Sequence, residues 1–105
     1  MSIKDLAQTI AARAGADPSE SWTANLMANP DKAAEKFGEE AVEAIIEATR
    51  LSSGGGDTAR LTSEAADVVY HLLVMCAAHG VTLADIEGEL ARRTAQSGLQ
   101  EKASR

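Results

Sequence analysis

The sequence has few aromatic residues and one cysteine. The first shortage argues against a β-sheet fold, and the second excludes a disulfide within the chain. Aromatic residues make up 3% of its 105 residues, while alanine dominates the composition. Sheets draw on aromatic and β-branched side chains, whereas alanine is the strongest helix former, so we expect an all-α protein. The one cysteine, Cys76, cannot form a disulfide within the chain. We interpret it as a small hydrophobic side chain in a reducing compartment.

Long hydrophobic runs and a surplus of basic charge are also missing. No apolar stretch approaches the roughly 20 residues that span a bilayer, and Lys4, Asp5 and Arg13 interrupt the segment where a signal peptide needs an apolar core. A net charge of −6 offers no basic patch to a nucleic-acid backbone. We therefore expect a cytoplasmic protein that has neither a membrane nor a nucleic acid as its partner.

Hydrophobic periodicity and breaker residues divide the chain into about five helices. A proline after Asp17 and another after Asn29 predict the starts of two of them, and Thr82 and Asp85 have the spacing of a capping box. The expected helices cover residues 2–14, a short segment from Pro18 that contains Trp22, residues 30–51, residues 57 or 58 to 79, and residues 82–94. We expect one helical domain over residues 1–105, with a polar tail at 96–105.

The two long helices are predicted to lie antiparallel, because the glycine-rich segment 52–56 breaks the chain between them. The first should carry an apolar stripe, with its glutamates on a neighbouring face. That stripe comprises Phe37, Ala41, Ala44, Ile45, Ala48 and Leu51. The second is apolar at all but two positions from Val68 to Ala78, so it should be covered on most sides. One chain of short helices supplies too little cover, and we expect a homodimer that completes the core.

Both long helices carry acids one turn apart. Glu39, Glu40, Glu43 and Glu47 share one helical face, and Glu64, Asp67 and His71 share another. Residues 35–67 hold eight acids and three bases, so five of the six excess negative charges fall within a third of the chain. Like charges at this spacing repel, and the second set lies in an apolar helix where an unpaired carboxylate is costly to desolvate.

Paired carboxylates on two facing helices supply the hard oxygen ligands that Mg²⁺ prefers. Such a cluster would hold ions that polarise a phosphate oxygen and lower the pKa of a bound water, which indicates hydrolysis of a phosphoanhydride. The alternative is that the glutamates form an ordinary solvated helix face. That alternative is weaker for Glu64 and Asp67, because they precede a run of apolar residues on the same helix.

Three further residues are candidates for contacts with a substrate. Lys32 and Lys36 could neutralise phosphate, or they could simply pair with neighbouring glutamates. His71 could be a base or a ligand, although a lone histidine on an apolar helix is more often a core residue bonded to a carbonyl or carboxylate. The sequence has no Walker-type phosphate loop and no zinc-spaced set of cysteine and histidine.

Three segments, together with the end of the chain, resemble phosphoribosyl-ATP pyrophosphohydrolases, which belong to the all-α, MazG-like nucleotide pyrophosphohydrolases. They are Ser21-Trp22-Thr23, Lys36-Phe37-Gly38-Glu39-Glu40-Ala41-Val42-Glu43 and Glu64-Ala65-Ala66-Asp67-Val68-Val69-Tyr70-His71-Leu72-Leu73, with the closing Ser97-Gly98-Leu99-Gln100-Glu101-Lys102-Ala103-Ser104-Arg105. The paired acids mark only the superfamily. The tryptophan segment, the Tyr70-His71 helix and the tail point to the specific enzyme.

The resemblance implies Mg²⁺-dependent hydrolysis of phosphoribosyl-ATP to phosphoribosyl-AMP and pyrophosphate, in histidine biosynthesis. It implies that Glu40, Glu43, Glu64 and Asp67 are metal ligands, with Glu39 an outer ligand or the group that orients water. Lys36 would steady the phosphates. Many family members carry two adjacent lysines there, and in this chain the first is replaced by Glu35, so Lys32 is the candidate for a second contact. Lys102 and Arg105 could contact the phosphoribosyl group.

Two other functions fit the same features. One is a MazG-like housekeeping enzyme that cleaves ordinary or damaged nucleoside triphosphates. The other is a helical dimerisation module whose acids only face solvent. Preference among nucleotide substrates distinguishes the housekeeping enzyme from the specific enzyme. The dimerisation module is distinguished from both enzymes because it should not bind Mg²⁺ with a nucleotide.

Overall fold

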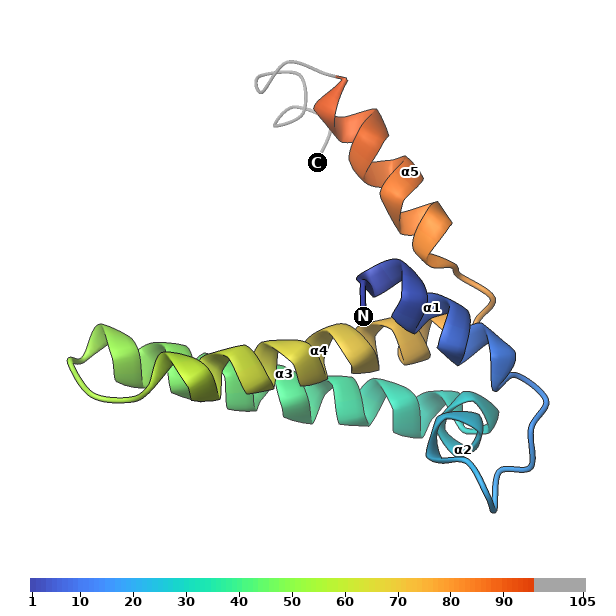
Figure 1. Ribbon diagram of the computed structural model, residues 1–105, viewed down its shortest axis with the longest axis horizontal. Helices are drawn as coiled ribbons and strands as arrows, with labels where there is room; N and C mark the ends of the chain where they lie inside the picture. Colours follow the sequence, from blue (N-terminus) through green and yellow to red (C-terminus); the bar gives the residue numbers. More distant parts are fainter. Residues whose placement is uncertain (96–105) are drawn as a thin grey trace.

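The computed structural model describes residues 1–95, and that part of the chain is all-helical (Figure 1). The helices are α1 (Ile3–Ala12), α2 (Trp22–Ala28), α3 (Pro30–Ser52), α4 (Thr58–Ala77) and α5 (Leu83–Thr94). The predicted all-α class and the pair of long helices are confirmed. The predicted tail at 96–105, with Lys102 and Arg105, lies outside the described residues.

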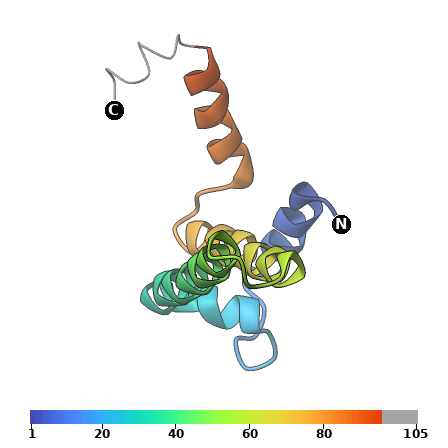
Figure 2. The same cartoon turned by 90° about the vertical axis from the view of Figure 1, so that its left-hand side faces the viewer.

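Helices α3 and α4 run antiparallel and make the most extensive contact between elements (Figure 1). Helix α1 packs on α4, and α2 contacts both α3 and α4 near the start of α3. Helix α5 leads away from the other four (Figure 2). The radius of gyration is 16.1 Å, against about 13 Å for a compact domain of this length. No helix among residues 1–95 is long and apolar enough to cross a membrane.

Local side-chain bonds explain where most helices begin. Thr82 and Asp85 form the predicted capping box at α5, in which the Thr82 side chain accepts from the Asp85 backbone N–H and the Asp85 carboxylate accepts from that of Thr82. Ser2 and Asp5 form the same device at α1. At α4 the Asp57 carboxylate accepts from the Ala59 backbone N–H at 2.8 Å. Each such bond satisfies a backbone donor that the helix itself cannot.

The predicted start of the short helix at Pro18 is wrong. The Asp17 carboxylate accepts from the Ser19 backbone N–H at 2.9 Å and from the Ser19 hydroxyl, which closes a turn instead of starting a helix. Helix α2 begins three residues after that turn, where the Ser21 hydroxyl accepts from the Ala24 backbone N–H. Ser21 and Asp17 are both good N-cap residues, but Asp17 bonds within the turn and Ser21 caps the helix.

The end of α4 also differs slightly from the prediction. The helix ends at Ala77, and Gly80 then adopts φ +74°, the left-handed conformation expected of a terminating glycine. The Val81 backbone N–H donates back to the Cys76 carbonyl at 3.0 Å. The glycine stop is therefore confirmed, while His79 lies beyond the helix.

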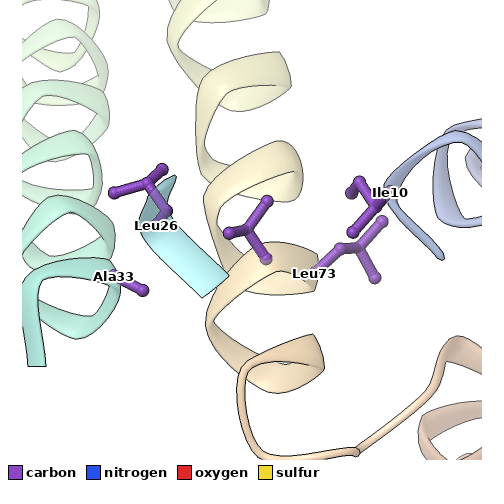
Figure 3. Packing of buried hydrophobic residues seen from close by; sticks show 5 residues of the cluster. Ile10, Leu26, Ala33 and Leu73 are labelled. Carbon is purple, nitrogen blue, oxygen red and sulfur yellow. The ribbon is translucent and has the colours of Figure 1, made fainter. Parts of the chain in front are cut away.

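The hydrophobic core lies where α1, α2, the start of α3 and the second half of α4 meet. Figure 3 shows Leu26 of α2 between α3 and α4, and Ile10 and Leu73 pointing toward one another from α1 and α4. Ala33 and Val74 complete the buried cluster. Burying one such leucine contributes about 1.5 to 3 kcal/mol. This core fixes the two long helices at one end of the pair.

The predicted apolar stripe of α3 is only partly correct. Phe37, Ala41, Ala44 and Leu51 are half-buried as expected, but Ile45 is 62% exposed and Ala48 is also exposed. Glu47 is buried instead, with 9% of its surface exposed. The face that α3 turns toward α4 therefore carries carboxylates in its second half, while Val42, Ile45 and Ile46 lie on the outside.

Candidate functional site

Three carboxylates meet in the middle of the α3–α4 pair. Glu40 and Glu43 lie one turn apart on α3, and Glu64 lies opposite them on α4. One oxygen from each lies within 4.8 Å of the other two. Glu40 and Glu64 are half-buried and Glu43 is exposed. The structure thus brings together three of the four predicted metal ligands, and we call them the carboxylate cluster.

The carboxylate cluster is electrostatically strained. Burial raises the pKa of Glu40 above its ordinary value, and the nearby charges of Glu43 and Asp67 raise it further, while His71 opposes them. The pKa of Glu64 is raised by burial first, then by the adjacent carboxylate of Glu43 and by the charges of Asp67 and Glu40. Both shifts show that negative charge is disfavoured here, so a cation would relieve the site.

One oxygen of the cluster lacks the hydrogen bond that burial normally demands. Glu64 Oε2 is buried and has no hydrogen-bond partner among residues 1–95. A buried polar atom without a partner is costly, and in native structures it points to a water, an ion or a functional role. The same carboxylate contributes an oxygen to the group formed with Glu40 and Glu43.

Asp67 and Glu39 lie at the margin of the cluster. Asp67 is exposed and is not one of the three residues whose oxygens meet, although its charge acts on both Glu40 and Glu64. Glu39 is exposed and accepts a hydrogen bond from Lys36 Nζ at 3.0 Å. Of the five predicted catalytic acids, these two are therefore outside the group of three.

Lys36 lies beside the cluster, one turn before Glu40. Its pKa is raised by the hydrogen bond to Glu39 and the charge of Glu39, and to a lesser degree by Glu40 and Glu43. The ammonium thus stays protonated next to the acids. The pairing with a neighbouring glutamate, considered above as an alternative, is present in the structure, and an exposed pair of this kind is weak enough to exchange for a phosphate.

Lys32 does not reach the carboxylate cluster. Its Nζ donates to Asn25 Oδ1 at 3.3 Å and lies 4.8 Å from the centre of the Trp22 ring. Both partners belong to α2. The predicted second phosphate contact is therefore directed toward α2 in this structure.

His71 is buried, with 8% of its surface exposed. Its Nδ1 lies 2.8 Å from the backbone carbonyl of Asp67. Because a carbonyl only accepts, Nδ1 carries the hydrogen, which leaves Nε2 as the acceptor of the neutral ring. This is the core histidine bonded to a carbonyl, one of the alternatives that the sequence left open.

The structure adds a buried acid that sequence reasoning did not single out as a ligand. Glu47 lies one turn beyond Glu43, and its Oε1 accepts from Arg50 at 2.8 Å. Its Oε2 is buried and has no partner among residues 1–95. The available signal was its place in the glutamate stripe of α3, but spacing alone does not reveal which glutamate turns inward.

A second feature links segments that are far apart in sequence. The Thr23 hydroxyl of α2 and the Tyr70 hydroxyl of α4 are hydrogen-bonded across 47 positions. Tyr70 also stands edge-on to the ring of His71, with ring centres 4.9 Å apart. The tryptophan segment and the Tyr70-His71 segment are thus neighbours.

Comparison with known proteins relates the chain to one enzyme family. Residues 3–94 match the family model described as phosphoribosyl-ATP pyrophosphohydrolase. A phosphoribosyl-ATP pyrophosphatase of Paracoccus denitrificans (strain Pd 1222) is 66% identical over 101 residues, which cover 95% of this chain and 89% of that protein. A phosphoribosyl-ATP pyrophosphatase of Dinoroseobacter shibae is 65% identical over 101 residues, which cover 95% and 94% of the two chains.

Proposed function

The chain belongs to the phosphoribosyl-ATP pyrophosphohydrolase family, and on that premise we propose that its carboxylate cluster holds Mg²⁺ and hydrolyses a phosphoanhydride of the substrate. The protein is a hydrolase of histidine biosynthesis, and it converts phosphoribosyl-ATP to phosphoribosyl-AMP and pyrophosphate. The observation that carries the assignment of the site is the meeting of Glu40, Glu43 and Glu64 within 4.8 Å.

The donor set fits a divalent cation with hard-ligand preference. Octahedral Mg²⁺ has ligand distances of about 2.1 Å, so its oxygen ligands lie at most about 4.2 Å apart. Adjacent ligands lie about 3 Å apart, so the cluster oxygens, which lie within 4.8 Å of one another, would close by up to about 2 Å, a movement that side-chain rotation can supply. The unpartnered Glu64 Oε2 and the raised pKa values of Glu40 and Glu64 also support a cation here.

When bound, Mg²⁺ would supply charge neutralisation on the phosphate oxygens and a lower pKa for a water molecule. Glu40, Glu43 and Glu64 would hold it, and Asp67, whose charge acts on Glu40 and Glu64, would be the fourth ligand. Glu39 would orient the attacking water or act as an outer ligand. Lys36, released from Glu39, would steady the leaving pyrophosphate.

We further propose that the protein acts as a homodimer. Val42, Ile45 and Ile46 leave an apolar outer face on α3, with exposed fractions of 54%, 62% and 44%. The chain has 6949 Å² of accessible surface, against roughly 5,600 Å² for a compact monomer of this mass. The excess exceeds the roughly 800 Å² per partner that a standard interface buries. Sedimentation should give a dimer that Ile45→Asp disrupts, and a monomeric wild type would reject the proposal.

We place the enzyme in the cytoplasm. The one cysteine, Cys76, lies half-buried and unpaired in α4, which suits a reducing compartment. Fractionation of cells that express the natural protein would test this placement.

The test of the function is pyrophosphate release by the purified protein with Mg²⁺. Phosphoribosyl-ATP is compared with ATP and with oxidised nucleoside triphosphates at equal concentrations. Rapid release from phosphoribosyl-ATP alone is expected. Broad release would indicate a housekeeping enzyme, and no release from any substrate would return the acids to a solvated surface. Glu87→Gln, a change to an exposed acid of α5, is the matched control and should keep full activity.

A further inference from the structure

Trp22 is the only tryptophan of the chain and is 50% exposed, although tryptophan is usually well buried. It is the first residue of α2, held in place from both sides. Ser21 caps the helix, and Thr23 is hydrogen-bonded to Tyr70 of α4. The ring is therefore presented on the surface by a segment that is anchored to the core, which is the arrangement of a binding surface rather than of a loose loop.

The surroundings of the ring are polar and cationic. Lys32 Nζ lies 4.8 Å from the ring centre, and the same ammonium donates to Asn25 Oδ1. The ammonium thus lies against the indole, and half of the surface of Trp22 remains exposed to a ligand. A protein partner would be expected to meet a contiguous apolar patch, but the exposed apolar face of α3 begins at Val42, ten positions beyond Lys32.

The order of side chains along α3 matches the order of groups in a nucleotide. Lys32, Lys36 and Glu40 follow one another at intervals of four residues on one helical face. Lys32 and Glu40 are separated by about 12 Å along the axis, because eight residues rise 1.5 Å each. An aromatic ring with Lys32 against it, the ammonium of Lys36 and a carboxylate cluster therefore follow in sequence, as do a base, its phosphates and a metal ion in a bound nucleotide.

We propose that Trp22 is the surface on which the adenine ring of the substrate stacks, with Lys32 behind the indole and Lys36 toward the phosphates. This inference rests on the proposed function for its substrate class. Base stacking on an aromatic side chain tolerates any substituent that leaves the π-face of the base free. Lys32 then has a role different from the phosphate contact that the sequence suggested, since it supports the ring through a cation–π contact.

The first experiment uses the unaltered protein and its single tryptophan. The emission of Trp22 is followed while AMP is added in EDTA, with pyrophosphate at the same concentrations as the adenine-free probe. AMP should quench the emission in a saturable way, and pyrophosphate should not. No quenching by AMP, or equal quenching by both, would overturn the proposal. An emission maximum that shifts to the blue as protein concentration rises would also overturn it, because a second copy would then cover the ring.

The second experiment asks what the ring contributes to substrate binding. Trp22→Ala should raise KM for phosphoribosyl-ATP about 5- to 150-fold, the range expected for one stacked base, with kcat within about twofold. Trp22→Phe should restore KM to within about threefold of the wild type. Leu90→Ala, which removes an exposed apolar side chain of α5, is the matched control and should change neither constant. A loss of kcat at unchanged KM in Trp22→Ala would contradict a stacking role.

The two experiments separate this inference from the function on which it rests. Quenching by AMP in EDTA needs neither Mg²⁺ nor turnover. A protein that binds AMP but releases no pyrophosphate would reject the function and keep the base site. A protein that hydrolyses phosphoribosyl-ATP without quenching by AMP would keep the function and reject the base site.

Discussion

At one end of the α3–α4 pair, Leu26 and Val74 are almost completely removed from water, and α1 and α2 close over them. In the middle of the same two helices, Glu40, Glu43 and Glu64 bring three carboxylates together, and one buried oxygen of Glu64 has no partner within residues 1–95. The apolar end stabilises the fold. The acidic part costs stability unless a cation occupies it, which is a common property of active sites.

Continuous helices join the two parts, and this explains how the acidic part stays folded although it costs stability. A long helix transmits the position fixed at its packed end to side chains several turns away. The core residues Ala33 and Leu73 therefore hold the backbone that carries Glu40 and Glu64. Stability and chemistry reside in different stretches of the same helices, and single substitutions should separate them.

The largest effect is expected from Glu64→Gln. This change keeps the side-chain shape but removes the charge that binds the cation, so turnover of phosphoribosyl-ATP should fall by at least about 10³-fold. Far-UV circular dichroism should stay unchanged. The metal-free variant should unfold no earlier than wild type, because the repulsion from Glu43 and Asp67 is relieved. Unchanged turnover would reject Glu64 as a ligand and weaken the contrast between the two parts.

Leu26→Ala should have the opposite signature. Leu26 of α2 is fully buried between α3 and α4, and its truncation should lower the free energy of unfolding by about 2 to 5 kcal/mol. Below the unfolding transition, kcat should remain close to wild type. Urea titration measures the first quantity, and initial rates measure the second. A variant as stable as wild type would show that the apolar end is not the main source of stability.

Addition of Mg²⁺ tests the acidic part without any substitution. At a concentration 100 times its dissociation constant, the ion should raise the free energy of unfolding by about 2.7 kcal/mol. Glu40→Gln should lose most of this gain. Thermal unfolding with and without EDTA gives the difference. Equal stabilisation of wild type and variant would place the ion elsewhere.

The same measurement should depend on pH in a defined direction. The pKa values of Glu40 and Glu64 are raised, by burial first and by Glu43 and Asp67 next. A raised carboxyl pKa favours the folded state at low pH, and this contribution is lost as pH rises through the folded value. As pH falls from 7 toward the ordinary value of 4.5, protons should displace Mg²⁺. The curves with and without Mg²⁺ should therefore converge, and a gap that widens on acidification would contradict this account.

The smallest effect is expected in α5, which has no buried residues. Hydrogen bonds from Arg92 and Arg93 lower the pKa of Glu89 to about 2. The stabilising contribution of Glu89 is present above its unfolded pKa and is lost as pH falls toward 2. Because these groups are exposed and screened by salt, Glu89→Gln at neutral pH should raise hydrogen exchange only within α5. A lower global unfolding midpoint would show that α5 contributes to global stability beyond the packing of Leu83 and Ile86 against the core.

Much of this arrangement follows from local sequence signals. The Thr82 and Asp85 pair, the stop at Gly80 and the proline at the start of α3 depend on neighbouring residues only, and each prediction is confirmed. The predicted start of α2 was wrong because Asp17 and Ser21 are equally good N-cap residues. Only the tertiary arrangement, in which Thr23 meets Tyr70, decides between them.

The carboxylate cluster was also predictable in part from local sequence signals. Acids three residues apart share a helix face, so Glu40 and Glu43 could be placed together from spacing alone, and Glu64 could be placed opposite them. The inward turn of Glu47 and the attraction of Lys32 to Trp22 could not. Both depend on the rotation of α3 against α4 and on the position of α2, which periodicity does not define.

The most direct test of the metal site is anomalous diffraction from crystals grown with Mn²⁺ in place of Mg²⁺. An anomalous peak should appear among the carboxylates of Glu40, Glu43 and Glu64, at about 2.1 Å from at least two of their oxygens. It should be absent from Glu64→Gln crystals grown in the same solution. A wild-type map with no peak at these residues, or with its only peaks on the exposed acids of α5, would contradict the account.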